Sequence, residues 1–150
     1  MANSLSAFTI NPNTGVLTAV QGSPFATGVS PQRPAADVTG TWLYVPNEQD
    51  KTVTMFAIDQ NTGALNSQGT DATGDSPTGI AIDLSNTFTY IADSSSDQIS
   101  SYNRAKLLGI LDSIGTVIAR DSPTGITLAN GISPVKYVPK YAYVAKSGKW

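Results

Sequence analysis

Apolar residues recur along this chain in short segments that are hydrophobic on both sides of an extended strand. In the segment 53–58, Val53, Met55 and Ala57 would face one side while Phe56 and Ile58 face the other. A sheet with one solvated face would alternate apolar and polar residues, so this pattern predicts sheets that are buried on both faces. Residues that favour strands and turns are abundant and helix formers are few, which indicates an all-β protein.

The strand pattern repeats about every 46 residues. SAFTINPNTGVLT at 6–18 reappears as TMFAIDQNTGALN at 54–66, and SPQRPAADVTGTWLYVPN at 30–47 reappears as SPTGIAIDLSNTFTYIAD at 76–93. A third copy begins with SPTGITLANG at 122–131 and continues, after a short insertion, with KYAYVAK at 140–146. Repeats of roughly 40–50 residues with four strands each are typical of β-propeller blades stacked around an axis. A β-sandwich would not explain the repeat.

Each repeat is expected to form four strands within a single domain spanning 1–150. Asn-Thr-Gly sequences between the third and fourth strands supply the positive φ that a tight hairpin requires. The domain would consist of a partial blade at 1–21, blades at 30–68 and 76–118, and a partial blade at 122–150. The expected first strands of the repeats are 35–38, 80–84 and 126–129, and the second strands are 42–45, 88–92 and 141–145. The expected third strands are 5–10, 53–58 and 99–102, and the fourth strands are 16–20, 64–67 and 110–114.

The repeat also resembles that of a known family, the lactonase-like and YVTN-type seven-bladed β-propellers. The shared pattern is P…AxDxxGxxLYVxNxxxxxVxxFxIDxxTGxL, and GSPFATG at 22–28 is typical of bacterial members. The resemblance implies a propeller fold, and it implies little about activity because such propellers include enzymes, binding proteins and uncharacterised chains. It is carried by Pro34, Ala36, Asp37, Gly40, Leu43, Tyr44, Val45, Asn47, Val53, Phe56, Ile58, Asp59, Thr62, Gly63 and Leu65.

The two terminal segments are in complementary phase within the repeat. The chain starts with strands three and four of one blade and stops after strands one and two of another. Natural propellers have about 4–8 blades, so three blades would not close a ring alone. We expect a homodimer that forms a six-bladed ring by head-to-tail blade completion, with a nine-bladed trimer or a truncated piece of a seven-bladed protein as alternatives. The expected seam residues are Leu5, Phe8, Ile10, Tyr141, Tyr143 and Trp150.

Composition excludes several classes of chemistry. The sequence has no cysteine and no histidine, which excludes disulfides, thiolate metal sites, a Ser-His-Asp triad and most zinc sites. Neither a metal nor a cofactor is expected. A net charge of −2 and the absence of a long apolar run argue against nucleic-acid and membrane partners. The start MANSLSAFTI does not read as a signal peptide, so we expect a soluble chain of unknown compartment, although the relatives are often exported.

Candidate ligand-binding residues lie near the starts of the innermost strands, where propellers usually bind ligands. A guanidinium there would suit a small anionic or carbohydrate ligand such as a sugar acid. For Arg33, the alternatives are a solvated side chain or an ion pair with Asp75 or Asp121. For the residues after the second strands, the alternative is ordinary turn chemistry, since Asn and Asp favour such loops. The candidates are Arg33, Thr78 and Thr124 at the inner strands, with Asn47 and Asp93 on the loops after the second strands.

The residue types favour binding over catalysis. The family resemblance implies, as one alternative, hydrolysis of a sugar-acid lactone, for which related enzymes use His, Glu and Arg from several blades. This sequence has no histidine, and Glu48 is its single glutamate. The prediction is therefore a non-enzymatic binding or scaffold module that self-assembles. A lactonase-like hydrolase and a fragment of a larger seven-bladed propeller are the competing interpretations.

Overall fold

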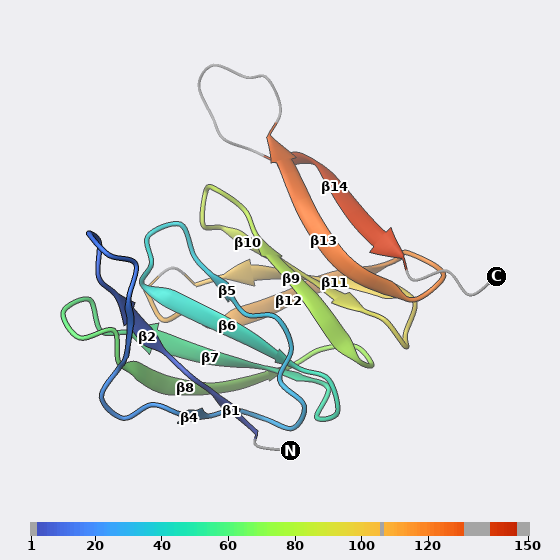
Figure 1. Cartoon of the computed structure of the whole chain (residues 1–150). Helices are drawn as coiled ribbons and strands as arrows, with labels where there is room; N and C mark the ends of the chain where they lie inside the picture. Colours follow the sequence, from blue (N-terminus) through green and yellow to red (C-terminus); the bar gives the residue numbers. More distant parts are fainter. Residues whose placement is uncertain (1–2, 106, 131–138, 147–150) are drawn as a thin grey trace.

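The protein is built from β-strands that form two complete four-stranded sheets (Figure 1). The computed structural model describes residues 3–105, 107–130 and 139–146, and no helix occurs among them. Within each sheet, neighbouring strands are antiparallel and follow one another in sequence, as in a propeller blade. The first sheet contains β5 (Ala35–Ala36), β6 (Trp42–Asn47), β7 (Thr52–Ile58) and β8 (Leu65–Ala72). The second contains β9 (Pro77–Ile82), β10 (Phe88–Asp93), β11 (Gln98–Arg104) and β12 (Leu111–Ile118).

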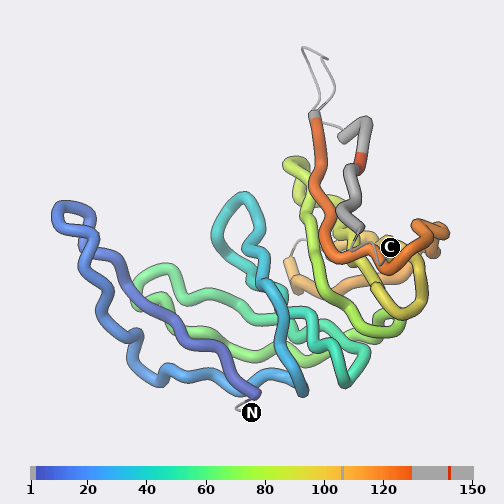
Figure 2. Tube along the Cα trace, turned by 45° about the vertical axis from the view of Figure 1, so that its right-hand side comes forward, coloured from blue at the N-terminus to red at the C-terminus, as the bar shows by residue number. Residues whose placement is uncertain are grey.

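Half-blades flank the two complete sheets. On the C-terminal side, β13 (Pro123–Asn130) pairs with β14 (Pro139–Lys146) in the manner of the first two strands of a blade. On the N-terminal side, β2 (Phe8–Ile10) pairs with β3 (Leu17–Ala19) in the manner of the last two strands. Figures 1 and 2 place these two half-blades at opposite ends of an arc, with the complete blades between them.

The expected third strand at 5–10 is divided into two pieces. Its first piece, β1 (Ser4–Leu5), pairs with β4 (Phe25–Ala26), whereas Phe8 lies opposite Ala19 in β3. The partner strand is therefore interrupted between β3 and β4, over residues 20–24. Ser23 in this loop uses its hydroxyl to accept the backbone N–H of Ala7 at 3.0 Å, which satisfies the donor where the pairing is interrupted.

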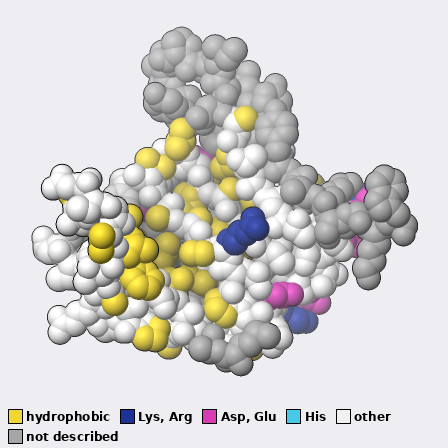
Figure 3. All heavy atoms as spheres, in the orientation of Figure 1, with side chains coloured by type: hydrophobic (Ala, Val, Ile, Leu, Met, Phe, Trp, Pro, Cys, Tyr) yellow, Lys and Arg dark blue, Asp and Glu magenta, His cyan; other side chains and the backbone are white. Residues whose placement is uncertain are grey.

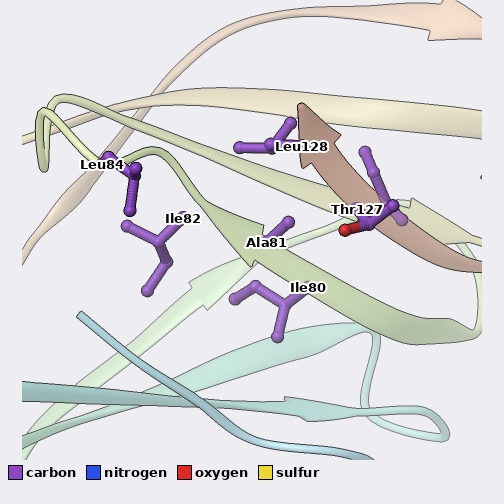
Figure 4. A pocket seen from close by; sticks show the side chains of 7 residues that line it. Ile80, Ala81, Ile82, Leu84, Thr127 and Leu128 are labelled. Carbon is purple, nitrogen blue, oxygen red and sulfur yellow. The ribbon is translucent and has the colours of Figure 1, made fainter. Parts of the chain in front are cut away.

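The first strands of successive repeats lie side by side on the inner side of the arc. β9 contacts β13 on one side and β5 and β6 on the other. Gly79 of β9 comes so close to β13 that a Cβ on it would lie 2.9 Å from the Cα of Gly125. Farther along the same two strands there is a hollow of about 320 Å³, lined by aliphatic side chains that include Ile80, Ile82 and Leu128 (Figure 4).

The core fills the spaces between sheets, as the two-sided hydrophobic pattern predicts. One cluster joins the two complete blades, with Tyr44 and Met55 packing against Ile91 and Tyr102. A second cluster of Val45, Phe56 and Leu65 packs toward the N-terminal half-blade, whose Leu5 and Phe25 border it. Successive residues of β7 thus enter different interfaces, because alternate side chains of a strand point to opposite faces. Burial on both faces explains the near-absence of alternating polar positions in this strand.

Candidate functional site

The sequence-predicted channel residues lie at one end of the inner strands. Two strands, β9 and β13, begin at Pro77 and Pro123, and Pro31 forms an isolated bridge to Asn47 at the equivalent place. The serine before each proline has a left-handed backbone: φ is 60° at Ser30, 54° at Ser76 and 50° at Ser122. Because the same geometry recurs in every repeat, it serves the chain reversal that enters each blade rather than a single specialised site.

Thr78 and Thr124 are half-buried beside the contact between β9 and β13. The Thr78 hydroxyl lies 3.4 Å from the carbonyl oxygen of Ala92 and 3.3 Å from that of Pro123, and can donate to either. One of these carbonyls belongs to its own blade and the other to the next repeat. The side chain of Thr78 therefore ties neighbouring inner strands together, and its hydroxyl is partly committed to that contact.

Arg33 is an exposed cation at this end of the inner strands. Within the part of the chain that the structure describes, no ion pair or hydrogen bond involves its guanidinium. Asp75, one of the two partners considered from the sequence, instead pairs with Lys51 at 2.9 Å on the exposed surface. The guanidinium of Arg33 is thus exposed to solvent.

Glu48 lies in the loop after β6, close in space to the segment that carries Arg33. Its carboxylate accepts a hydrogen bond from the Gln32 side-chain amide at 2.7 Å and another from the Ser30 hydroxyl at 3.3 Å. The backbone of Gln32 also donates to the carbonyl of Pro46 at 2.8 Å. These bonds hold the segment before β5 against the end of β6, so Glu48 has a positioning role.

Asn47 and Asp93 are the last residues of β6 and β10 and are fully buried, not exposed on loops as the sequence suggested. The register explains their equivalence, since Asn47 bridges Pro31 and Asp93 lies opposite Pro77. Lys146 occupies the same register position opposite Pro123. The sequence analysis placed these residues after the second strands, whereas each is the last residue of its strand and is covered by the loop that enters its blade, at Gly28 and Gly74.

The buried environments of Asn47 and Asp93 are built in the same way. The Asn47 amide donates to the hydroxyls of Thr52 and Thr54, at 3.0 and 2.8 Å, and the Ser100 hydroxyl donates to Asp93 at 2.5 Å. In each residue the Oδ1 atom has no hydrogen-bond partner in the described structure. Burial raises the pKa of Asp93 to about 6, against the opposing effect of the hydrogen bond from Ser100.

A glycine lies over each of these buried side chains. A Cβ on Gly28 would lie 2.7 Å from the side-chain carbon of Asn47, and one on Gly74 would lie 2.7 Å from a carboxylate oxygen of Asp93. These distances leave no room for a larger residue, so the two glycines allow the entering loop to close over the strand ends. No signal other than the repeat spacing of Gly28 and Gly74 could have identified this role.

A buried ion pair between the complete blades was not anticipated from the sequence. Arg104 of β11 lies 3.5 Å from the carboxylate of Asp37, with both side chains almost wholly buried. Arg104 also donates to the carbonyl of Asn86, and the amide of Asn86 donates to Asp37 at 3.3 Å. The sequence carried one sign of this ion pair. Arg104 stands at the repeat position that the apolar Ile58 occupies in the preceding repeat.

Asp37 also closes the turn after the first strand, as does its repeat equivalent Asp83. One oxygen of Asp37 accepts the backbone N–H groups of Thr41 and Trp42, at 2.8 and 3.1 Å. Asp83 accepts the corresponding N–H groups of Thr87 and Phe88, each at 2.7 Å. Both aspartates are therefore structural.

The predicted seam residues fall in both half-blades. Leu5 is half-buried, whereas Phe8 and Ile10 of β2 are 51% and 67% exposed. Tyr141 and Tyr143 lie on β14, and Trp150 lies outside the described residues.

No group of three acidic side chains that could hold a metal ion occurs in the described ranges. The described chain likewise contains no helix long and apolar enough to cross a membrane.

Comparison with known proteins places these features in a family. The model of the family described as lactonase, 7-bladed beta-propeller, matches residues 1–82, which is more than half of the chain. Among curated proteins, no sequence matches.

Several solved structures share the fold. A candidate 6-phosphogluconolactonase from Bacteroides fragilis has a TM-score of 0.76 and 22% identity, with coverage of 83% of this chain and 35% of that one. A second candidate 6-phosphogluconolactonase, from Bacteroides uniformis, has a TM-score of 0.72 and 18% identity, with coverage of 96% and 38%. The periplasmic gluconolactonase of Pseudomonas aeruginosa has a TM-score of 0.69 and 20% identity, with coverage of 77% and 34%. The chain thus spans little more than a third of the length of these proteins, and the likeness establishes the fold alone.

Proposed function

Because the chain belongs to the family of seven-bladed lactonase β-propellers, we propose that its blades form part of a closed ring that binds a sugar acid or its lactone. The ligand class is suggested by the names of the gluconolactonase and 6-phosphogluconolactonase relatives. The single observation that carries the proposal is the exposed guanidinium of Arg33, which has no ion pair among the described residues.

Arg33 has the chemistry that a sugar acid requires. A guanidinium presents a planar fork of N–H donors that matches the two oxygens of a carboxylate or a phosphate. Its place before β5, at the end of the inner strands, would put the anionic group of a ligand near the axis of the ring. Sugar hydroxyl groups would then meet the polar loops that carry Gln32 and Glu48.

Binding fits the described residues better than hydrolysis does. A lactonase must activate a water molecule with a positioned base, and the sequence lacks histidine. Glu48 is already held by Ser30 and Gln32, and the Asp93 carboxylate is buried away from solvent. We therefore propose a binding ring, with lactone hydrolysis as the outcome that would replace it.

The proposal is tested by titrating the chain with 6-phosphogluconate and gluconate in a calorimeter. We expect saturable binding that weakens at least tenfold in the variant Arg33→Gln. Lys51→Gln is the matched control, because Lys51 is an exposed cation at the same end of the blades that is already paired with Asp75. Equal weakening in both variants, or none in Arg33→Gln, would contradict the proposal.

Hydrolysis is measured in parallel with δ-gluconolactone by following acid release at constant pH. We expect the rate with protein to equal that of the buffer alone. A rate that rises in proportion to protein concentration would show catalysis and would replace the binding proposal with the lactonase one.

A further inference from the structure

The turn between β11 and β12 differs in residue type from the equivalent turns of the other repeats. Those turns contain Asn13-Thr14-Gly15 and Asn61-Thr62-Gly63, whereas Leu107-Leu108-Gly109 stands in their place here. The pairing of β11 with β12 keeps the register of β7 with β8, which confirms that the turns are equivalent. Two leucines therefore occupy positions that are polar elsewhere in the chain.

The backbone of this turn keeps the shape it has in the preceding blade. Ala105 donates its N–H to the carbonyl of Ile110 at 2.9 Å, as the equivalent residues do at the same distance. The φ angle is 67° at Gly109 and 74° at Gly63. The Tyr44 hydroxyl donates to the carbonyl of Gly109 at 2.9 Å and fixes the base of the turn to the neighbouring blade. The turn is thus formed by its backbone and its glycine, and it does not need the leucine side chains.

The two leucines are exposed to solvent. Leu107 is 92% exposed and Leu108 is 61% exposed, and Ile110 at the end of the turn is 39% exposed. Asn61 and Thr62 are also exposed, although outer strands lie on both sides of their blade, β2 with β3 on one side and β11 with β12 on the other. The exposure therefore belongs to this position at the rim of a blade, and a neighbouring blade does not remove it.

The same turn has lost an acidic side chain. In the preceding repeat the carboxylate of Asp59 accepts two backbone N–H groups of the turn, each at 2.9 Å, and Ala105 replaces it here. The sequence also has Lys106 where that repeat has Gln60. These exchanges remove a negative charge and add a positive one beside the leucines. An aliphatic tip of this charge matches a lipid surface, where acyl chains lie beneath phosphate groups.

Most of the exposed charged side chains among the described residues lie at the other end of the blades. Figure 3 shows the most prominent acidic and basic side chains in the right-hand half of the view, whereas Figure 1 places the turn between β11 and β12 toward the left. A surface that meets this turn would leave those charges in water. They belong to Arg33, Asp50, Lys51, Asp75, Asp97, Arg120 and Asp121.

We propose that the turn carrying Leu107 and Leu108 docks on a lipid bilayer, with both leucine side chains inserted below the phosphate groups. The partner is a membrane surface because the leucines protrude from the tip of a hairpin, which suits insertion between lipids better than contact with a flat protein face. Peripheral contact of this kind needs no membrane-spanning segment. It is independent of the Arg33 site, which lies at the opposite end and stays open to solution.

Co-sedimentation of the 150-residue chain with vesicles of phosphatidylcholine and phosphatidylserine tests the proposal, with a sample without vesicles to correct for aggregation. The variant Leu107→Asn/Leu108→Thr restores the turn of the preceding repeat and should therefore fold. We expect it to bind the vesicles at least tenfold more weakly than the unmodified chain does. The matched control is Ile118→Thr, since Ile118 is 75% exposed at the other end of β12, and this variant should bind like the unmodified chain.

A fluorescent label measures which end of the molecule meets the lipid. The natural chain has no cysteine, so Leu107→Cys and Gln49→Cys can each carry one polarity-sensitive label, and Gln49 is exposed in the loop at the opposite end. We expect vesicles to shift the emission to shorter wavelength at position 107 only. Equal shifts at the two positions, or equal losses of binding in Leu107→Asn/Leu108→Thr and Ile118→Thr, would overturn the proposal. Absence of vesicle binding by the unmodified chain would also overturn it, and would leave another protein as the partner of the turn.

Discussion

At the residue scale, Asn47 at the end of β6 and Asp93 at the end of β10 occupy equivalent buried environments. The two side chains have nearly the same shape and the same register position, and each is covered by an equivalent glycine, Gly28 or Gly74. They differ because only the side chain of Asp93 can ionise. Burial raises the pKa of Asp93 to about 6 from an ordinary value of 3.8. The protonated form is therefore favoured by folding, and ionisation of Asp93 destabilises the folded state.

The variant Asp93→Asn is expected to raise the free energy of unfolding at pH 7 by roughly 2–3 kcal/mol. Well below pH 3.8 Asp93 is protonated whether the chain is folded or unfolded, so the gain should vanish there. Above that limit, the wild-type chain loses stability as pH rises through the range 3.8 to about 6. Urea unfolding at about pH 2.5 and at pH 7 measures both effects.

The reciprocal variant Asn47→Asp supplies the control. It is expected to destabilise the chain at pH 7 and to introduce a loss of stability with rising pH. A variant Asp93→Asn that has no effect at either pH would mean that the carboxylate is well solvated in the folded protein.

At the element scale, the two complete blades are joined by polar contacts as well as by the apolar cluster. Arg104 of β11 reaches Asp37 of the preceding blade, and the Tyr44 hydroxyl donates to the carbonyl of Gly109 at 2.9 Å. The Tyr102 hydroxyl donates across the same interface to the carbonyl of Ala72 at 2.8 Å. These bonds set the angle between sheets that apolar packing alone would leave adjustable.

Removing the cation from the interface should be costly because it leaves the buried Asp37 carboxylate without its charge partner. Arg104→Met is expected to lower the free energy of unfolding by about 3 kcal/mol. The double variant Arg104→Met/Asp37→Asn should recover part of this loss, because an asparagine oxygen can still accept the turn N–H groups. A double-mutant cycle by chemical denaturation measures the coupling, and purely additive effects would contradict a direct interaction.

The contact between inner strands makes a second prediction at this scale. A Cβ on Gly79 would lie 2.9 Å from the Cα of Gly125 and 3.1 Å from the carbonyl oxygen of Thr124. Since both neighbours are backbone atoms, Gly79→Ala must push β9 and β13 apart, at a cost of about 1–3 kcal/mol. Thermal unfolding checks this, with Thr127→Ala on the facing strand as the control. An unchanged midpoint would mean that the two strands separate freely.

At the scale of the whole molecule, the N-terminal end of the arc leaves apolar side chains exposed to solvent. The apolar residues of β2 are exposed although their equivalents in the complete blade form its core. In a closed propeller such a face packs against a neighbouring blade, because each blade contacts the blades on both of its sides.

Most of the fold could be predicted from the sequence because it is repeated. The spacing of about 46 residues located every strand of the complete blades, although the fourth strands β8 and β12 end five and four residues beyond the expected ends at 67 and 114. The division of the expected strand 5–10 into β1 and β2 was missed, because a loop inserted in the partner strand leaves no mark on the apolar pattern of 5–10. The positions of Thr78 and Thr124 at the inner strands were also readable from the repeat.

The sequence by itself determined the blades, their order and the type of each strand, because these depend on local turn chemistry and on side-chain alternation. Only the tertiary structure decided that Asn47 and Asp93 are buried, that Arg104 pairs with Asp37, and that Arg33 is left without an ion pair among the described residues. Burial and pairing depend on what other segments bring to the same point in space. A repeat shows which positions are equivalent, whereas the environment of each copy is set by the segments that pack against it.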